Sequence, residues 1–164
     1  MAKLIKEQAR EDAERVLRDY WDDGFPIDPV EIAQSLGVKV WTAEFPHDVA
    51  GQLVQREGKP AEIYLNGTDG DTRQTFTCAH EVGHYWERSQ HDDAEYSFTD
   101  HRGEAPPSDA HEWYADHFAA NLLMPEDEFR SKKAAGASVA KLASHFAVSR
   151  QAVMTRIRSL GLEP

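Results

Sequence analysis

The spacing of apolar and polar residues predicts helices near both ends of the chain and strands between them. Residues 3–20 carry apolar side chains at helical intervals among many charges, which is typical of an amphipathic helix. A second, short helix is expected with Asp28 as its N-cap, Pro29 as its first residue and Gly37 as its stop. Three runs rich in β-branched and aromatic residues follow and predict a small antiparallel sheet. They span residues 38–41, 51–54 and 62–65.

The second half of the chain is predicted to be helical apart from one polar stretch. A helix capped by Asp71 or Thr72 should run to about Glu87. Residues 89–107 are polar and acidic, so a long loop is expected there, and Ser108 would cap the next helix. These expectations describe an α+β fold in which a mostly helical chain carries a small sheet.

Length and composition narrow the class of protein. A chain of 164 residues is long enough for one domain with a buried core. Its single cysteine, Cys78, excludes an internal disulfide, and no apolar run reaches the roughly 18 residues of a membrane span. The first residues also lack the apolar stretch of a signal peptide. We therefore expect a cytoplasmic protein with no membrane partner.

Charge is distributed unevenly along the chain. The net charge of -11 argues against general affinity for nucleic acid, because an acidic body repels phosphates. Residues 131–162, however, contain six lysine and arginine residues and no acidic residue, so this segment is locally basic. The two regions are therefore expected to differ in their partners.

The clearest chemical signal is the pattern His-Glu-x-x-His within residues 77–86. His80 and His84 are four residues apart, so on a helix they lie one turn apart on one face and can bind a single zinc ion. Glu81 lies beside that face, where its carboxylate can act as the general base on a water that the metal polarises. Gly83 costs about 1 kcal/mol relative to alanine in a helix interior, which indicates that another segment packs closely there.

A catalytic zinc ion has three protein ligands and one open position, so a further ligand is expected downstream. Glu112 and Asp116 are four residues apart on a predicted helix, and the small side chains of Ala115 and Ala119 permit close contact with the first helix. We predict that Glu112 is the third ligand and that Asp116 accepts the free ring N–H of one ligating histidine. The alternative is that both carboxylates face solvent, as most acidic side chains do.

The chain resembles the ImmA/IrrE family of zinc metallopeptidases, which belong with the gluzincins. The resemblance covers about residues 10–125 and rests on residues 27–33, on residues 73–85 with the His-Glu-x-x-His pattern, and on residues 112–125. By that resemblance, the metal ligands are His80, His84 and Glu112, the catalytic residue is Glu81, and Asp116 is the acidic position that follows the third ligand.

The resemblance also implies a function. Several members of the family cleave a helix-turn-helix repressor, often of a phage or mobile element, and so switch on the genes that it silences. We therefore expect a zinc-dependent endopeptidase whose protein substrate is such a transcriptional repressor. Zinc is the default ion, and Mn²⁺ is an alternative for the same nitrogen and oxygen ligands.

Other residues are candidates for narrower roles. The oxyanion of a tetrahedral intermediate needs a hydrogen-bond donor, and the sequence does not choose among six side chains that could also serve packing or face solvent. Cys78 lies about 200° around the helix from His80, so we interpret it as a buried small hydrophobe. The candidate donors are Tyr85, His91, His101, His111, Tyr114 and His117.

Residues 139–157 resemble a helix-turn-helix, with a turn at residues 147–149 and a second helix capped by Ser149. The polar positions of the second helix would be exposed and available to DNA or a protein partner. We favour packing or protein recognition over DNA binding, because the rest of the chain is acidic. These positions are Arg150, Gln151, Thr155, Arg156 and Arg158.

We thus expect a metallopeptidase domain at residues 1–130 and a helix-turn-helix-like segment at residues 131–164 that packs on the same domain. The main alternative comes from a different class: a DNA-binding or protein-binding regulator with a non-catalytic metal site. A fourth protein ligand would favour that alternative, because structural zinc sites are closed.

Overall fold

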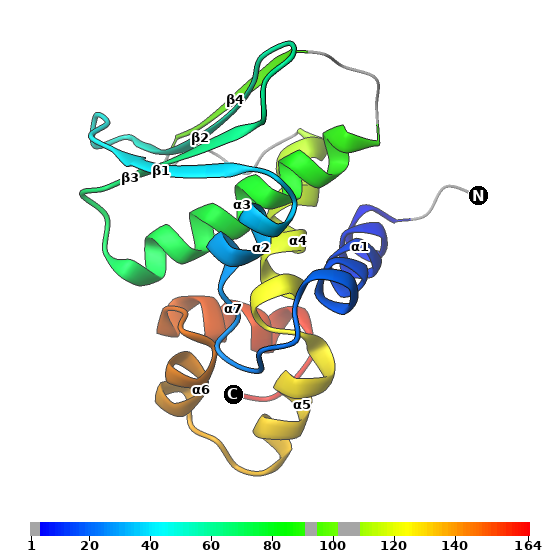
Figure 1. Cartoon of the computed structure of the whole chain (residues 1–164). Coiled ribbons are helices and arrows are strands. Elements are labelled where there is room, and N and C mark those ends of the chain that lie inside the picture. The colour runs from blue at the N-terminus through cyan, green and yellow to red at the C-terminus, as the bar shows by residue number, and fades with distance from the viewer. Residues whose placement is uncertain (1–3, 91–94, 102–108) are drawn as a thin grey trace.

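The computed structural model describes residues 4–90, 95–101 and 109–164. Within these ranges the fold is α+β, with seven helices and one four-stranded sheet. Helix α3 (Asp71–Ser89) lies between the sheet and the helices α1 and α4 (Figure 1). No helix in the described part of the chain is both long and apolar enough to cross a membrane.

The N-terminal helices form where the polar and apolar pattern predicts them. Helix α1 (Ile5–Tyr20) packs against helix α4 (Ala110–Leu123) through a stripe of buried small residues that includes Ala9 and Ala13. Helix α2 (Pro29–Ser35) begins with proline, and the side chain of Asp28 accepts a hydrogen bond from the N–H of Val30. This N-cap satisfies one of the free backbone donors of the first turn.

The sheet differs from the prediction in two respects. Its strands are β1 (Lys39–Ala43), β2 (Val49–Gln55), β3 (Glu62–Asn66) and β4 (Tyr96–His101), in the order β1-β3-β2-β4. First, β1 pairs with β3 in parallel, so the sheet is mixed and not antiparallel. Second, β4 lies within the stretch that was expected to be a loop.

The structure describes only part of the predicted loop. Residues 91–94 and 102–108, which include the expected N-cap Ser108, lie outside the described residues. Helix α4 is capped within the described part by Asp109, whose side chain accepts a hydrogen bond from the N–H of His111. The long predicted loop therefore contains at least one ordered strand.

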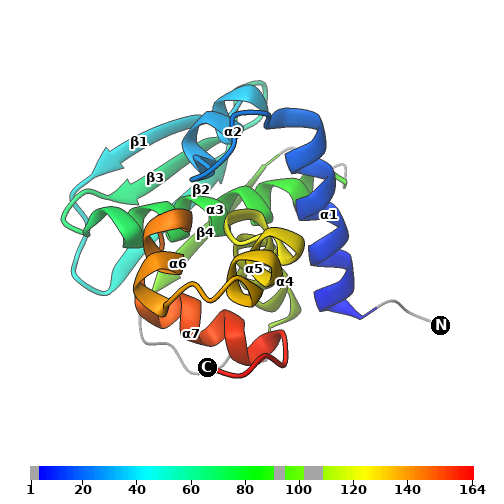
Figure 2. The ribbon, with the colours of Figure 1, turned by 90° about the horizontal axis from the view of Figure 1, so that it is seen from below.

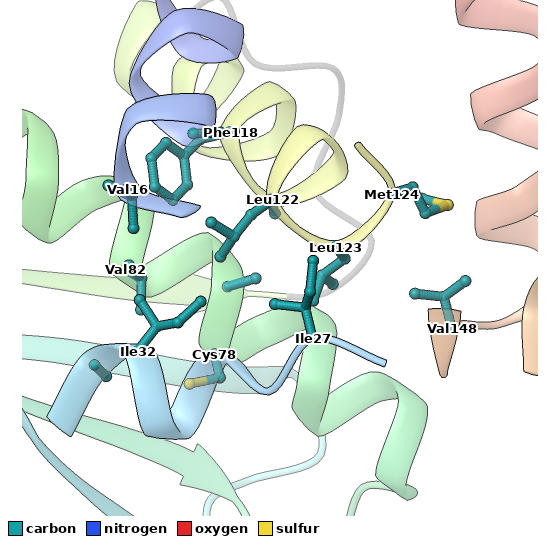
Figure 3. Packing of buried hydrophobic residues seen from close by; sticks show 14 of the residues in the cluster. Val16, Ile27, Ile32, Cys78, Val82, Phe118, Leu122, Leu123, Met124 and Val148 are labelled. Atoms are coloured by element: carbon teal, nitrogen blue, oxygen red, sulfur yellow. The ribbon is translucent and has the colours of Figure 1, made fainter. Parts of the chain in front are cut away.

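The core forms where α3 meets α1, α2 and α4. Phe118 and Leu122 of α4 point toward Val82 of α3 (Figure 3). A Cβ at Gly83 would lie 3.0–3.1 Å from Phe118, so the close approach that this glycine predicts is present. Cys78 is fully buried beside α2, as expected of a small hydrophobe, and burial raises the pKa of its thiol well above the ordinary value.

Three short helices complete the chain on the side of α3 away from the sheet (Figures 1 and 2). They are α5 (Glu126–Ala134), α6 (Val139–Phe146) and α7 (Arg150–Ser159). Ala147 ends α6 in the left-handed conformation, with φ of 55°, and the side chain of Ser149 caps α7. Helices α6 and α7 pack against each other across this tight turn.

Arg156 corrects one expectation about α7. Its guanidinium donates hydrogen bonds to the carbonyl of Met124 and to Oδ1 of Asn121, and the residue is only 5% exposed. Burial lowers the pKa of Arg156 to about 10. Because its donors are used inside the protein, Arg156 anchors α7 to the end of α4 and is not a surface contact for DNA or a partner.

A substitution at Gly51 tests the contact between β2 and α3. A Cβ there would lie 2.6 Å from Cγ2 of Thr77 and 2.9 Å from the carbonyl oxygen of Tyr64. Gly51→Ala should therefore lower the free energy of unfolding by about 1–3 kcal/mol, as overpacking does. Chemical denaturation measures the change, with Gly67→Ala as the control because a Cβ at Gly67 would meet its nearest atoms at 3.6 Å, an ordinary contact distance. Equal stability of Gly51→Ala and the wild type would contradict this packing.

Candidate metal centre

Helix α3 places three chemically active side chains in the interior. His84 and Glu81 are fully buried, and His80 is 7% exposed. The helix is covered on one side by β2 and β3 and on the other by α4, so the turn from His80 to His84 lies where both layers meet. Such burial of ionisable groups is costly unless they are paired or bind a metal.

Four side chains from three elements converge at this turn. His80 and His84 come from α3, Glu112 comes from α4, and Asp100 comes from β4. Nε2 of His80 lies 3.1 Å from Oε2 of Glu112, and Nε2 of His84 lies 3.0 Å from Oε1 of the same carboxylate. Oδ1 of Asp100 lies 3.1 Å from Nε2 of His80 and 3.9 Å from Nε2 of His84.

These distances suit a single small cation. With metal–ligand bonds of about 2.0–2.2 Å, the ligand atoms of a tetrahedral site lie about 3.3–3.6 Å from each other. The separations between the imidazole nitrogens and the carboxylate oxygens, 3.0–3.9 Å, bracket that spacing. Two imidazoles and two carboxylates also form a donor set that zinc accepts. The group can therefore hold a metal ion.

Asp100 is the one member of the group that sequence reasoning missed. It lies in the acidic stretch between the two helices, where no helical spacing relates it to the histidines. The signal was the alternation of Tyr96, Phe98 and Asp100 with polar residues, which has the period of a strand. All three side chains are half-buried on the face that meets α3, and the side chains between them are exposed.

The two histidines are oriented by different neighbours. Nδ1 of His80 lies 2.8 Å from Oδ1 of Asp116, so the ring can donate its Nδ1–H there and direct the Nε2 lone pair toward the centre. The ring of His84 stacks on Phe98, with 4.6 Å between the ring centroids and an interplanar angle of 3°. Arg88 is on the same helix as His84, and its guanidinium carbon lies 5.0 Å from the centroid of the Phe98 ring.

The electrostatics of the group favour a bound cation. Burial alone would lower the pKa of His80, but hydrogen bonds to Asp100, Asp116 and Glu112 outweigh burial and raise that pKa well above 6.5. Burial would raise the pKa of Glu112, yet its hydrogen bonds with the histidines hold that pKa at about 2. The carboxylates thus retain negative charge that protons or a metal must balance.

Glu81 has an acidic neighbour, and no described residue donates a hydrogen bond to its side chain. Burial raises the pKa of Glu81 well above 4.5, and a hydrogen bond with Asp100 raises it further. The same contact, together with one from His80, outweighs burial at Asp100 and lowers the pKa of Asp100. In the described part of the chain, no N–H group and no hydroxyl donates to Glu81. Glu81 therefore lacks the donors that would stabilise its charged form.

The candidate oxyanion donors are dispersed. The hydroxyl of Tyr114 donates to Asp12 on α1, and His111 pairs with Glu87, so both are directed elsewhere. His101 is exposed beside Asp48 on the outer face of β4. Burial lowers the pKa of His117, whose ring contacts Trp113. Tyr85 is half-buried against the hydrophobic core, and His91 lies outside the described residues.

The polar residues of α7 lie outside the group of possible metal ligands. Arg150, Gln151, Thr155 and Arg158 are exposed, as expected. Gln151 and Thr155 line a cavity of about 630 Å³ that α3 and α4 also line, and Asp116 forms part of its wall. The exposed face of α7 is thus turned in part toward the body of the domain, close to the residue that orients His80.

The sequence model of Peptidase_M78, described as the IrrE N-terminal-like domain, matches residues 33–158. The chain belongs to this family. The match agrees with the resemblance carried by the His-Glu-x-x-His segment and extends it through the basic C-terminal helices. No curated protein sequence matches the chain.

Among the solved structures that share the fold of this Peptidase_M78 member is a Mycobacterium tuberculosis transcriptional regulator, with a TM-score of 0.60 and 14% sequence identity. The similarity covers 94% of this chain and 52% of the regulator, so the chain spans about half the length of the structure that it matches. At this identity the likeness shows a common fold.

Metal affinity should rise with pH. The carboxylates raise the pKa of His80, so the metal-free protein keeps a proton on this ring above the usual range, and a cation has to displace it. For one released proton, the affinity rises by up to about tenfold per pH unit below that pKa. Calorimetric titration of Zn²⁺ in buffers of different ionisation enthalpy, repeated at several pH values, measures the affinity and the number of protons released. Affinity that stays constant with pH would contradict this assignment.

Proposed function

We propose that this protein is a zinc-dependent endopeptidase whose ligands are His80, His84 and Glu112 and whose general base is Glu81. The observation that carries the proposal is the convergence of both Nε2 atoms on Glu112, with a buried glutamate between the two histidines in sequence. Membership of the Peptidase_M78 family supports the same chemistry.

Each side chain has a distinct role in this proposal. A bound zinc ion supplies a Lewis acid that polarises the attacking water and the scissile carbonyl. Glu81 accepts the proton of that water and returns it to the leaving amine. Burial raises the pKa of Glu81, and a carboxylate with a raised pKa is a stronger base toward that water. Asp116 keeps His80 in the tautomer that ligates through Nε2.

The proposed substrate is a helix-turn-helix transcriptional repressor, such as one of a phage or mobile element. Two observations support a regulatory role: the family, and the shared fold with a transcriptional regulator. The exposed arginines of α7, Arg150 and Arg158, are proposed contacts for that partner or for DNA. Protein recognition is favoured because the chain as a whole carries a net charge of -11.

One observation favours a second function. Asp100 offers a fourth ligand atom, and a site with four protein ligands is typical of structural zinc. The second candidate is therefore a regulator that binds its partner and uses the metal only to hold α3, α4 and β4 together. This candidate predicts binding without cleavage.

Substitution of the proposed base separates the two functions. Glu81→Gln keeps the size of the side chain and removes its basicity, so cleavage of a repressor encoded beside this gene should slow by about 10²–10⁴-fold. Electrophoresis of the repressor over time measures cleavage, with zinc content matched between proteins. Glu87→Gln is the matched control, because Glu87 is on the same helix and pairs with His111 outside the metal group.

The outcomes differ for the two functions. Cleavage by the wild type and Glu87→Gln alone supports the peptidase. Cleavage by Glu81→Gln at the wild-type rate contradicts the role of Glu81. Binding of the repressor by all three proteins, with cleavage by none, supports the regulator.

A further inference from the structure

We infer that β4 is an inhibitory strand that keeps the metal centre closed, and that it must leave β2 before a substrate can be cut. Asp100 of this strand takes the metal position that catalysis needs, and the backbone of β4 takes the place of an extended substrate. This inference rests on the proposed peptidase function.

The position of Asp100 is incompatible with an attacking water. Its carboxylate oxygen lies 3.1 Å from Nε2 of His80 and 3.9 Å from Nε2 of His84, so it occupies the space beside both ligating nitrogens. Its side chain is 12% exposed, which leaves little access from solvent. A catalytic zinc site keeps one position for water or substrate, and here the carboxylate of Asp100 takes that position.

The backbone of β4 takes the position of a substrate. Strand β2 packs directly on α3, and a Cβ on its Gly51 would lie 3.6 Å from Oε2 of Glu81. The edge of β2 is therefore the strand edge beside the proposed base, and an extended peptide could pair with it through main-chain hydrogen bonds. Strand β4 already pairs with this edge in antiparallel register, from Gln55 opposite Tyr96 to Gly51 opposite Asp100.

Strand β4 can separate without unfolding the core. Its side chains alternate between half-buried and exposed, and none is among the fully buried hydrophobic residues, whereas β2 and β3 each contribute such residues. Besides the backbone ladder, β4 is held by Tyr96 and Phe98 against the core, by Asp100 beside the two histidines, and by the amide of Gln52, which donates to the hydroxyls of Ser97 and Thr99. The ladder is also irregular between Val49 and Gly51, next to Asp100. Elements with few buried apolar contacts open at the lowest cost.

The first test is removal of the carboxylate. Asp100→Asn should weaken binding of Co²⁺ by at least about tenfold, since even the loss of an outer-shell partner costs about 10–100-fold. It should change the visible spectrum of bound Co²⁺, abolish the metal-dependent hydrogen-exchange protection of β4 amides, and raise the rate of repressor cleavage. Thr99→Ser, on the exposed face of the same strand, keeps the hydroxyl that accepts from Gln52 and should match the wild type in all four measurements.

The second test locks the strand in place. Gln52 and Thr99 are directly opposite on β2 and β4, and opposed residues of an antiparallel pair lie within disulfide range. A disulfide in the Gln52→Cys/Thr99→Cys variant should abolish cleavage, and reduction should restore it. The buried Cys78 does not compete for pairing. The reduced form of the same variant is the control for the oxidised form.

Three results would overturn the inference. An unchanged Co²⁺ spectrum and unchanged β4 protection in Asp100→Asn would mean that Asp100 is not a ligand. Cleavage that stays the same or falls in Asp100→Asn would mean that the carboxylate does not inhibit. Full activity of the oxidised disulfide variant would mean that β4 stays in place during catalysis.

Failure of the proposed function gives a different result. The variant Asp100→Asn/Glu81→Gln carries both changes. If it cuts the repressor as fast as Asp100→Asn alone, cleavage does not depend on Glu81, and the proposed mechanism fails whatever β4 does. If the double variant loses cleavage while Asp100→Asn gains it, both the mechanism and the inhibitory strand are supported.

Discussion

The packing of α3 between β2 and α4 is the constraint on which the rest of the structure depends. Both contacts are made at glycines, Gly51 on the sheet and Gly83 on α3, where a Cβ would meet neighbouring atoms at 2.6–3.1 Å. This close approach brings Glu112 of α4 and Asp100 of β4 to Nε2 of His80, and Asp116 of α4 to Nδ1. Without it, the histidines would lack the carboxylates that complete the group.

The charge of that group explains why the positions of α3, α4 and β4 depend on each other. Four carboxyl groups, those of Glu81, Asp100, Glu112 and Asp116, surround the imidazole of His80, and among them only Asp116 is exposed. Buried like charges are unfavourable unless cations or protons balance them. A divalent ion would balance two of these charges and join α3, α4 and β4 at one point, so metal binding and the position of β4 are expected to be coupled.

Local patterns predicted the parts of the site that lie on one helix. The spacing of His80, Glu81 and His84 placed them together, and the four-residue interval between Glu112 and Asp116 placed both on one turn of α4. Asp100 escaped because its relation to the histidines comes from the pairing of β4 with β2, which no interval in the sequence encodes. The parallel pairing of β1 with β3 was missed for the same reason.

The error at Arg156 has a simpler cause. Its charge suggested exposure, but Val153, Arg156 and Leu160 are spaced as one helix face, and that face meets the end of α4. The carbonyl of Met124 and the side chain of Asn121 supply the partners that make burial of the guanidinium tolerable. Helical periodicity was therefore a better guide than residue type at this position.

Anomalous diffraction at the zinc edge, from crystals of the zinc-loaded protein, tests the central assignment most directly. The predicted result is a single strong peak about 2.0–2.2 Å from Nε2 of His80, from Nε2 of His84 and from a carboxylate oxygen of Glu112. A protein that binds no zinc at this point, or a peak that lies away from these three residues, would contradict it.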